Sequence, residues 1–321
     1  MVVDRAAGSV SHHTFAELPR FLRAGDAIVL NTTRVFRARL LGTRDGSGAP
    51  AEVLLLREHA DGTWEAMVQP GAKLKPGRVV ELAQGFTAEM LGSTARGTRL
   101  VRLSVAGTAA AVHAAVHAAI ATHGHVPLPP YISRADTATD EERYQTVFAR
   151  EEGSVAAPTA GLHFTPELLA ALADRGVSRA EVLLHVGAGT FKPVDAEDPS
   201  EHVMHEEWFR VTEDAADLLN ATRARGGRIC AVGTTALRTL ESVLRADGRF
   251  RAGTGETAIF IRPPQRPHSA DLLLTNFHLP RSTLLMLAAA VAGYALTMHA
   301  YDVAVREGYR FYSYGDAMLI T

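Results

Sequence analysis

Strand-like and helix-like segments alternate from about Pro127 to the C-terminus, and this alternation constrains the fold more than any other feature. Thr165-Pro166-Glu167 combines an N-cap threonine, a proline of the first turn and an acidic residue, which predicts a helix start. Strands are predicted at Glu181–Val186, Arg228–Val232 and Asp271–Thr275. This order is typical of an α/β fold, with a mostly parallel sheet flanked by helices on both faces.

Residues 37–104 show a different pattern, in which short strand-like runs follow one another without predicted helices. Short apolar or alternating runs are separated there by Asp45-Gly46, Asp61-Gly62 and Pro76-Gly77. Closely spaced short strands with turn signals are typical of a small barrel or sandwich. We therefore expect an α/β catalytic domain of residues 1–50 and 126–321, with an inserted small β-barrel domain of residues 51–125.

Composition excludes several classes of protein. The chain has 321 residues, 47% of them hydrophobic and 21% charged, which is not the composition of a disordered chain. Cys230 is the only cysteine, so no disulfide framework exists. The net charge of −2 predicts neither nucleic-acid nor membrane binding by itself.

No targeting or membrane-spanning segment is predicted. The longest apolar stretch, Leu284–Leu296, is shorter than the roughly 20 residues that cross a bilayer. We expect it to belong to one long buried helix over Ser282–Met298. We also expect a cytoplasmic monomer without a membrane partner.

Three predicted strands lead into small polar loops: Gly187-Ala188-Gly189-Thr190, Gly233-Thr234-Thr235 and Asn276-Phe277-His278. In an open parallel sheet, ligands bind outside the carboxyl ends of the strands. The glycines do not complete the dinucleotide fingerprint, because position 192 is lysine. The second loop leads into a helix, whose start either holds an anion such as a carboxylate or is simply capped by threonine.

Histidines and carboxylates in predicted loops are candidates for general acid–base chemistry, which we assign to His163, His185, Glu206 and Asp316. A turn aspartate is the alternative for Asp316. His202, His205 and Glu206 do not form a compact ligand set.

One further pair of histidines has a spacing that suits a metal ion. His113 and His117 are four residues apart on a predicted helix, a spacing that can bind a metal. The adjoining turns provide no acidic third ligand, so we expect no metal site.

Five strings make the chain similar to a known family: VAAPTAGLHFT at 155–165, LLHVGAGTFKPV at 183–194, AVGTTALRTLE at 231–241, TNFHLPRSTLLML at 275–287 and YRFYSYGDAMLI at 309–320. Together with NTTRVFRARL at 31–40, PLPPYI at 127–132 and ERYQTVF at 142–148, they closely resemble the S-adenosylmethionine:tRNA ribosyltransferase-isomerases of queuosine biosynthesis.

The resemblance implies a transferase-isomerase of tRNA modification. Enzymes of this family transfer the ribosyl moiety of S-adenosylmethionine to 7-aminomethyl-7-deazaguanine (preQ1) at the tRNA wobble position. The ribose rearranges, giving epoxyqueuosine, adenine and methionine. S-adenosylmethionine is thus a substrate, and we expect no cofactor. The family fold is an α/β domain with an inserted β-barrel.

Members of this family usually carry a further segment before the position that matches Val2-Val3-Asp4. We expect activity to depend on whether that segment contributes to the site. Two alternatives therefore stay open: a non-catalytic, N-terminally truncated tRNA-binding relative, and an S-adenosylmethionine-dependent methyltransferase. The expected glycine-rich first loop of a methyltransferase is not found.

Residue roles are hypotheses from side-chain chemistry and do not follow from the resemblance. Thr234, Thr235 and Arg238 suit the methionine carboxylate. Arg34, Arg37 and Arg39 either contact tRNA phosphate or brace the barrel junction. Residues expected to bind substrate are Thr159, Gly161, Gly187, Gly189, Thr190, Gly233, Thr234, Thr235, Arg238, Asn276 and His278.

Overall fold

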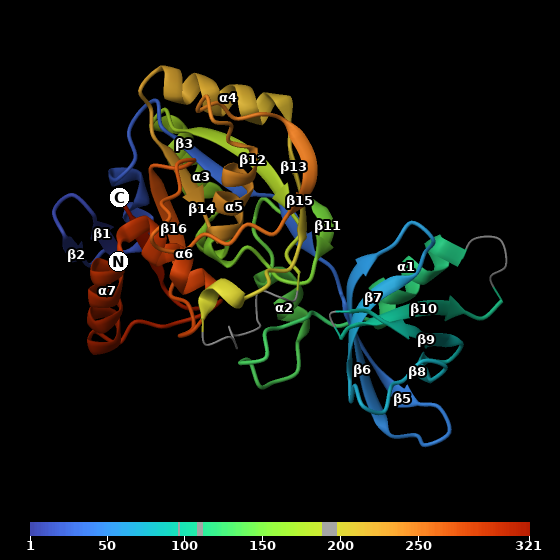
Figure 1. Cartoon of the computed structure of the whole chain (residues 1–321). Helices are drawn as coiled ribbons and strands as arrows, with labels where there is room; N and C mark the ends of the chain where they lie inside the picture. The colour runs from blue at the N-terminus through green and yellow to red at the C-terminus, as the bar shows by residue number, and fades with distance from the viewer. Residues whose placement is uncertain (96, 108–111, 188–197) are drawn as a thin grey trace. The chain divides into compact units, whose positions relative to one another are not determined.

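The computed structural model describes residues 1–95, 97–107, 112–187 and 198–321. The chain forms two compact units (Figure 1). One comprises residues 1–34, 143–151 and 157–321, and the other comprises residues 35–142 and 152–156. The second unit contains the barrel, and it begins before and ends after the range 51–125 expected from sequence.

A nine-stranded sheet organises the described residues of the first unit. Its strands, in spatial order, are β15 (Gly253–Thr257), β13 (Glu207–Val211), β12 (Ser178–Leu184), β3 (Ala27–Asn31), β14 (Ile229–Val232), β16 (Leu272–Asn276), β17 (Ala317–Ile320), β1 (Val2–Asp4) and β2 (Ser9–Ser11).

Parallel pairing is confined to two parts of this sheet. Strands β12, β3, β14 and β16 are parallel to their neighbours within that group, and β17 is parallel to β1. The β15–β13, β13–β12, β16–β17 and β1–β2 pairs are antiparallel. The prediction of a mostly parallel sheet is therefore not confirmed, because the sheet is mixed. Strand β13 follows β12 without a described α-helix between them, and a parallel pairing needs such a crossover.

One face of the sheet packs against short helical segments. Alternate residues of β3, Ile28 and Leu30, join Leu274 of β16 in a buried cluster. The cluster is covered by η1 (Phe15–Arg20), η2 (Thr159–His163) and α3 (Pro166–Asp174), which contribute Leu18, Ala160 and Leu172 among others. The predicted start of α3 is confirmed, since Oγ1 of Thr165 accepts a hydrogen bond from the Leu168 N–H.

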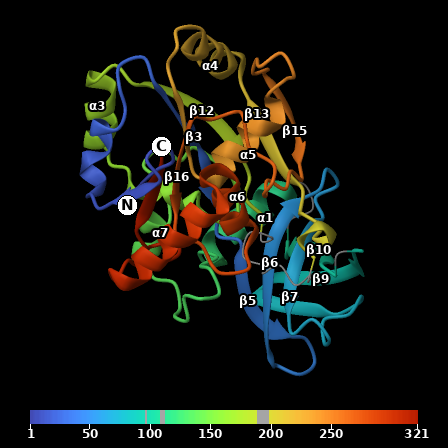
Figure 2. The ribbon, with the colours of Figure 1, turned by 60° about the vertical axis from the view of Figure 1, so that its left-hand side comes forward.

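The other face of the sheet is covered by α4 (Glu213–Ala224) and α5 (Thr234–Val243), as Figure 2 shows. Helix α5 contacts both β12 and β14. It is almost wholly buried, with an ion pair at its first turns that is described below.

The prediction of one long helix over Ser282–Met298 is wrong. Two helices, α6 (Thr283–Ala292) and α7 (Tyr294–Arg306), are bent by 115° at the break between them. Gly293 occupies the break with φ of 89°, a conformation that glycine adopts without the steric cost of a Cβ atom. Among the described residues, no single helix is both long and apolar enough to cross a membrane.

A closed barrel forms the second unit. Its strands, in order around the barrel, are β10 (Arg99–Val105), β7 (Trp64–Gln69), β6 (Pro50–Glu58), β5 (Arg39–Arg44), β8 (Val79–Ala83) and β9 (Phe86–Ser93). Inward-facing residues such as Val53, Ala88 and Val101 are fully buried. A Cβ at Gly42 would lie 2.3 Å from the Glu81 carbonyl oxygen, so glycine permits the close approach of β5 to β8. The predicted inserted barrel is confirmed.

The remaining elements are short or peripheral. Helix α1 packs against β10 of the barrel. Their bounds are α1 (Val112–His123), α2 (Ala138–Arg143), η4 (Pro199–Glu201) and the two-stranded sheet of β4 (Thr33–Val35) and β11 (Glu151–Ser154).

A buried carboxylate fixes the start of β3, an inner strand of the parallel part of the sheet. The side chain of Asp26, immediately before β3, is fully buried and accepts hydrogen bonds from the N–H groups of Arg23 and Arg228. It also accepts 2.6 and 3.2 Å hydrogen bonds from the Arg228 guanidinium. Burial alone would raise the pKa of Asp26, but these hydrogen bonds hold the pKa below its ordinary value.

Asp26→Asn should destabilise the protein at pH 7 by about 2 kcal/mol, because it weakens charge-assisted hydrogen bonds at a buried position. The pKa of Asp26 is depressed in the folded state, so its contribution is present above the unfolded-state value near 3.8 and is lost as the pH falls below it. Urea unfolding of both proteins from pH 7 to pH 3 measures this difference.

Asp302→Asn on the exposed side of α7 is the matched control and should change stability little. Equal stability of wild type and Asp26→Asn at pH 7 would contradict the role given to this carboxylate.

Candidate functional site

Polar residues follow the carboxyl ends of four adjacent strands. Because β12, β3, β14 and β16 are parallel, their ends lie along one edge of the sheet. Asn31 ends β3, His185 follows β12, Gly233 follows β14 and Asn276 ends β16. The sequence prediction that polar loops gather at these strand ends therefore agrees with the topology.

Asn31 ties two of these strand ends together. Its Nδ2 donates to the Leu184 carbonyl oxygen, and its Oδ1 accepts from the Leu184 and Thr33 N–H groups. Next to this arrangement, Nδ1 of His185 lies 3.0 Å from Oγ1 of Thr33, and the ring stacks on Trp208 at 5.2 Å between centroids. The position of the His185 ring is therefore fixed from two sides.

A buried ion pair lies at the first turns of α5. Arg238 Nη1 donates to Glu207 Oε2, and both side chains are less than 10% exposed. Glu207 Oε1 accepts a 3.1 Å hydrogen bond from the Gly187 N–H in the loop after β12. Among the described residues, the buried Nε and Nη2 of Arg238 have no hydrogen-bond partner, and neither does Oγ1 of Thr235.

These unsatisfied donors have a chemical consequence. A guanidinium presents Nε and Nη2 as a fork that matches a carboxylate in two parallel hydrogen bonds. The N-terminus of a ten-residue helix adds a partial positive charge. The first turns of α5 therefore carry donors of the kind that bind a carboxylate, and the role predicted for Thr234, Thr235 and Arg238 stays a prediction.

A second group of polar residues is centred on η2. Thr159 Oγ1 donates to Asn276 Oδ1 at 2.9 Å, and Asn276 Nδ2 lies 3.4 Å from His163 Nε2. Segment η2 also reaches the start of α5, since a Cβ at Gly233 would lie 3.7 Å from that of Ala160. Gly161 has a packing role, because a Cβ there would lie 2.7 Å from the Phe148 ring.

His163 lines a cavity of about 490 Å³. This volume lies within the range of small-molecule sites. The His163 ring stacks on Phe15, and Asp316, which also lines the cavity, forms a 2.8 Å ion pair with Arg310. The remaining lining residues are Met1, Val2, His13, Thr14, Leu18, Phe21, Leu274, Glu307, Gly308, Tyr309, Ala317 and Leu319.

Burial keeps three histidines of this edge neutral at physiological pH. It lowers the pKa of His163, which the charge of Asp316 partly restores, and it lowers the pKa of His185, which Glu151 partly restores. Burial lowers the pKa of His278 to about 4. A neutral imidazole can accept a proton, so His163 and His185 suit a general base.

His278 has structural contacts instead. Its ring Nε2 lies 2.7 Å from Thr275 Oγ1, and its backbone N–H donates a hydrogen bond to the Tyr301 hydroxyl. These contacts fix the loop after β16, which carries Asn276.

Comparison with known proteins identifies the family. The family model described as a queuosine biosynthesis protein matches residues 1–320. The S-adenosylmethionine:tRNA ribosyltransferase-isomerase of Moorella thermoacetica is 51% identical over all 321 residues, which cover 92% of that relative. The chain belongs to this family. The resemblance noted in its sequence is thereby confirmed.

Two further relatives support the assignment. The ribosyltransferase-isomerase of Rhodospirillum rubrum is 52% identical over 305 residues, which are 95% of this chain and 86% of that relative. The crystal structure of the Thermotoga maritima S-adenosylmethionine tRNA ribosyltransferase superposes with a TM-score of 0.54 at 36% identity. That match covers 100% of this chain and 91% of the solved one, so family membership extends over the whole chain.

The sequence-predicted site residues fall into separate groups. His163, Asn276, Thr159 and Asp316 gather around η2 and the cavity, while Gly187 lies with Arg238. Strands β3 and β14 separate the strand end of His185 from that of Asn276, and no described contact joins His163 to His185. Gly189 and Thr190 lie outside the described residues.

Glu207, the acidic residue paired with Arg238, is a site residue that the sequence analysis did not predict. Glu206, the predicted candidate, is exposed, whereas the adjacent Glu207 is buried with Arg238. Alternation along β13 is the signal that could have found it, since Glu207, Phe209 and Val211 share the buried face.

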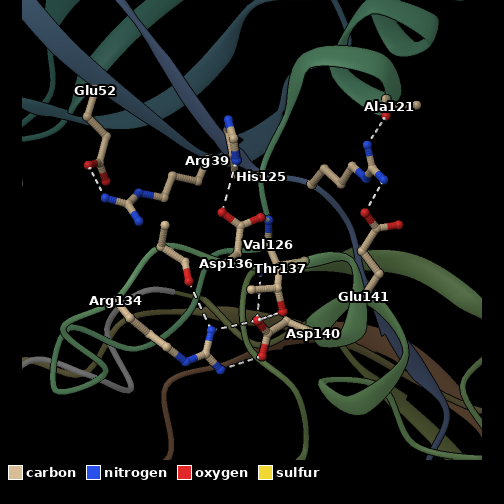
Figure 3. Close-up of polar contacts among 12 residues, drawn as sticks. Arg39, Glu52, Ala121, His125, Val126, Arg134, Asp136, Thr137, Asp140 and Glu141 are labelled. Carbon is tan, nitrogen blue, oxygen red and sulfur yellow. Dashed lines mark hydrogen bonds and ion pairs between the residues drawn. The ribbon is translucent and has the colours of Figure 1, made fainter.

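Two of the three candidate tRNA-binding arginines have partners within the second unit. Arg37 donates to the Ala121 carbonyl oxygen and to Glu141, and Arg39 forms a 2.8 Å ion pair with Glu52 (Figure 3). These contacts match the bracing alternative for both residues. Arg34 is exposed.

Asp316→Asn should lower the pKa of His163 further below its ordinary value of 6.5, because the negative charge of Asp316 stabilises the imidazolium. An NMR titration of the His163 imidazole resonances measures the shift. Asp302→Asn on exposed α7 should leave that titration unchanged. An unaltered or raised pKa in Asp316→Asn would show that the two groups do not interact as described.

Proposed function

We propose that this chain transfers and isomerises the ribosyl moiety of S-adenosylmethionine onto preQ1 at the wobble position of tRNA. The products are epoxyqueuosine-tRNA, adenine and methionine. The observation that carries the proposal is the match to ribosyltransferase-isomerases over the whole chain at about half identity. S-adenosylmethionine acts as a substrate, and the reaction as proposed needs no cofactor or metal ion.

The proposed reaction sets three chemical requirements. The sulfonium acidifies the C5′ protons of the ribose, so a base must accept a proton there. Adenine leaves with the aid of a proton or hydrogen-bond donor, and the amine of preQ1 must attack in its neutral form. Neutral, positioned imidazoles meet the first requirement, because an unprotonated ring nitrogen can accept the proton.

We infer that the methionine carboxylate binds at the start of α5. Arg238 has two unsatisfied buried N–H groups there, and the Thr235 hydroxyl is also unsatisfied among the described residues. Glu207 balances the charge of Arg238 and, through its bond to the Gly187 N–H, fixes the loop that follows β12. Glu207 is thus a positioning residue that holds the guanidinium fork in place.

His163 and His185 are the two proposed bases. His163 lines the cavity together with Asp316, whose negative charge stabilises the protonated ring. His185 lies two residues before Gly187, and Thr33 and Trp208 hold its ring. Replacement of the histidine that acts as the base by glutamine should remove most of the turnover of the enzyme. Replacement of the other histidine should mainly weaken substrate binding.

We propose a cytoplasmic location because the tRNA substrate resides there. A monomeric state is also proposed, and sedimentation velocity of the purified chain would test it. Arg34, whose side chain is exposed, is proposed to contact tRNA phosphate. Such contacts weaken as salt is raised.

Adenine should be released from S-adenosylmethionine only when tRNA carrying preQ1 is present. Chromatography of the products distinguishes the outcomes, because a methyltransferase would release S-adenosylhomocysteine and a tRNA-binding protein would release neither compound. Transfer RNA with guanine at the wobble position is the control substrate. Adenine formation without preQ1, or none with it, would contradict the proposal.

Arg238→Lys and Thr235→Val should raise the KM for S-adenosylmethionine with less change in kcat. Loss of one or two charge-assisted hydrogen bonds corresponds to roughly 10- to 100-fold in affinity. Lysine keeps the charge beside Glu207 but has no planar fork, so the substitution tests bidentate recognition. Adenine release at varied S-adenosylmethionine concentration supplies both constants.

Arg306→Lys on the exposed side of α7 is the matched control and should leave both constants unchanged. A fall in kcat at constant KM would place Arg238 in the chemical step and remove it from carboxylate binding.

A further inference from the structure

Three metal-binding side chains meet on the barrel unit, on residues that the proposed reaction does not use. His113 and His117 project from α1, and Glu58 ends β6. Glu58 Oε1 lies 3.2 Å from His113 Nε2, and Glu58 Oε2 lies 2.9 Å from His117 Nε2. One ligand atom from each residue can be chosen so that all three lie within 4.8 Å of one another.

The spacing suits one small cation. Zinc binds histidine nitrogen and carboxylate oxygen at about 2.0–2.2 Å, so the ligands of a tetrahedral ion lie about 3.4 Å apart. The two distances from Glu58 to the histidines, one of them a hydrogen bond, are slightly shorter than this value. Small rotations of these three side chains can therefore bring three donors onto one ion.

The surroundings limit these rotations. Glu58 is only 23% exposed, and the His117 ring lies 5.8 Å from that of Trp64, which is buried in the barrel. The two histidine rings lie 4.3 Å apart between centroids, on one side of α1. The donors are thus gathered before any ion binds, which lowers the entropy cost of binding.

We propose that Glu58, His113 and His117 bind one Zn²⁺ ion, with water in the fourth position. Two imidazoles and one carboxylate form a donor set typical of zinc with an open coordination position. Because the ligands come from α1 and β6, the ion links this helix to the barrel wall. The sequence alone does not indicate this site, because Glu58 lies 59 residues before His117 and only the fold brings the two together.

Zinc binding should be measured on the whole untagged chain after treatment with a chelator. Titration with zinc sulfate against a chromophoric chelator gives the stoichiometry and affinity. We expect one equivalent to bind and the melting temperature to rise, since an ion that binds only the folded state stabilises it. Co²⁺ in the same site should give the visible absorption of a tetrahedral ion.

His113→Ala and Glu58→Gln should each weaken zinc binding by about 100-fold or more, because even changes outside the ligand set cost 10- to 100-fold. His113 is 70% exposed, so its replacement should leave the fold intact. His123→Ala, at the end of the same helix, is the matched control and should bind zinc as the wild type does.

Trp64 offers a second readout at the site itself. The chain has two tryptophans, and Trp208→Phe leaves Trp64 as the sole one. Co²⁺ should quench Trp64 fluorescence in that variant, and quenching should disappear when His113→Ala is added. Zinc binding absent from the wild type at millimolar concentration, or equal in wild type and His113→Ala, would overturn the proposal.

Discussion

The position of β3 is the constraint on which the rest of the first unit depends. Asp26 at its start bonds to Arg228 before β14, and Asn31 at its end bonds to Leu184 of β12. Each of these polar side chains is buried, so losing its partners would cost far more than an exposed contact would. The two residues thereby align three parallel strands, and this alignment brings the site residues to one edge of the sheet.

Local signals explain what the sequence predicted correctly. The cap of α3 at Thr165 and the turn-punctuated barrel strands are set by neighbouring residues, and both were expected from them. The bend at Gly293 could not be predicted in this way. The continuous apolar stretch around it indicated one helix, whereas α6 and α7 meet at 115°. Local signals also do not give strand direction, because the antiparallel β12–β13 and β16–β17 pairs depend on the path of the chain between the strands.

Long-range contacts explain what could not be predicted in the candidate site. Glu206 and Glu207 are identical in chemistry. Alternation along β13 distinguishes the buried residue from the exposed one, but only the fold brings Glu207 to Arg238. The sequence predicts no metal at His113 and His117, because the adjoining turns carry no acidic residue. Barrel closure brings Glu58 there instead. Motifs thus indicated which loops matter, whereas partners from distant strands decided which atoms face one another.

The unsatisfied groups of Arg238 and Thr235 link stability to function. A buried donor without a partner costs about 1–3 kcal/mol, and a folded protein tolerates few of them. No group among the described residues forms a hydrogen bond with these atoms, which lie in the first turns of α5. A carboxylate bound as proposed would satisfy Nε, Nη2 and the hydroxyl at once, and binding would then offset this cost. Since Glu207 already holds the guanidinium, little further ordering opposes that gain.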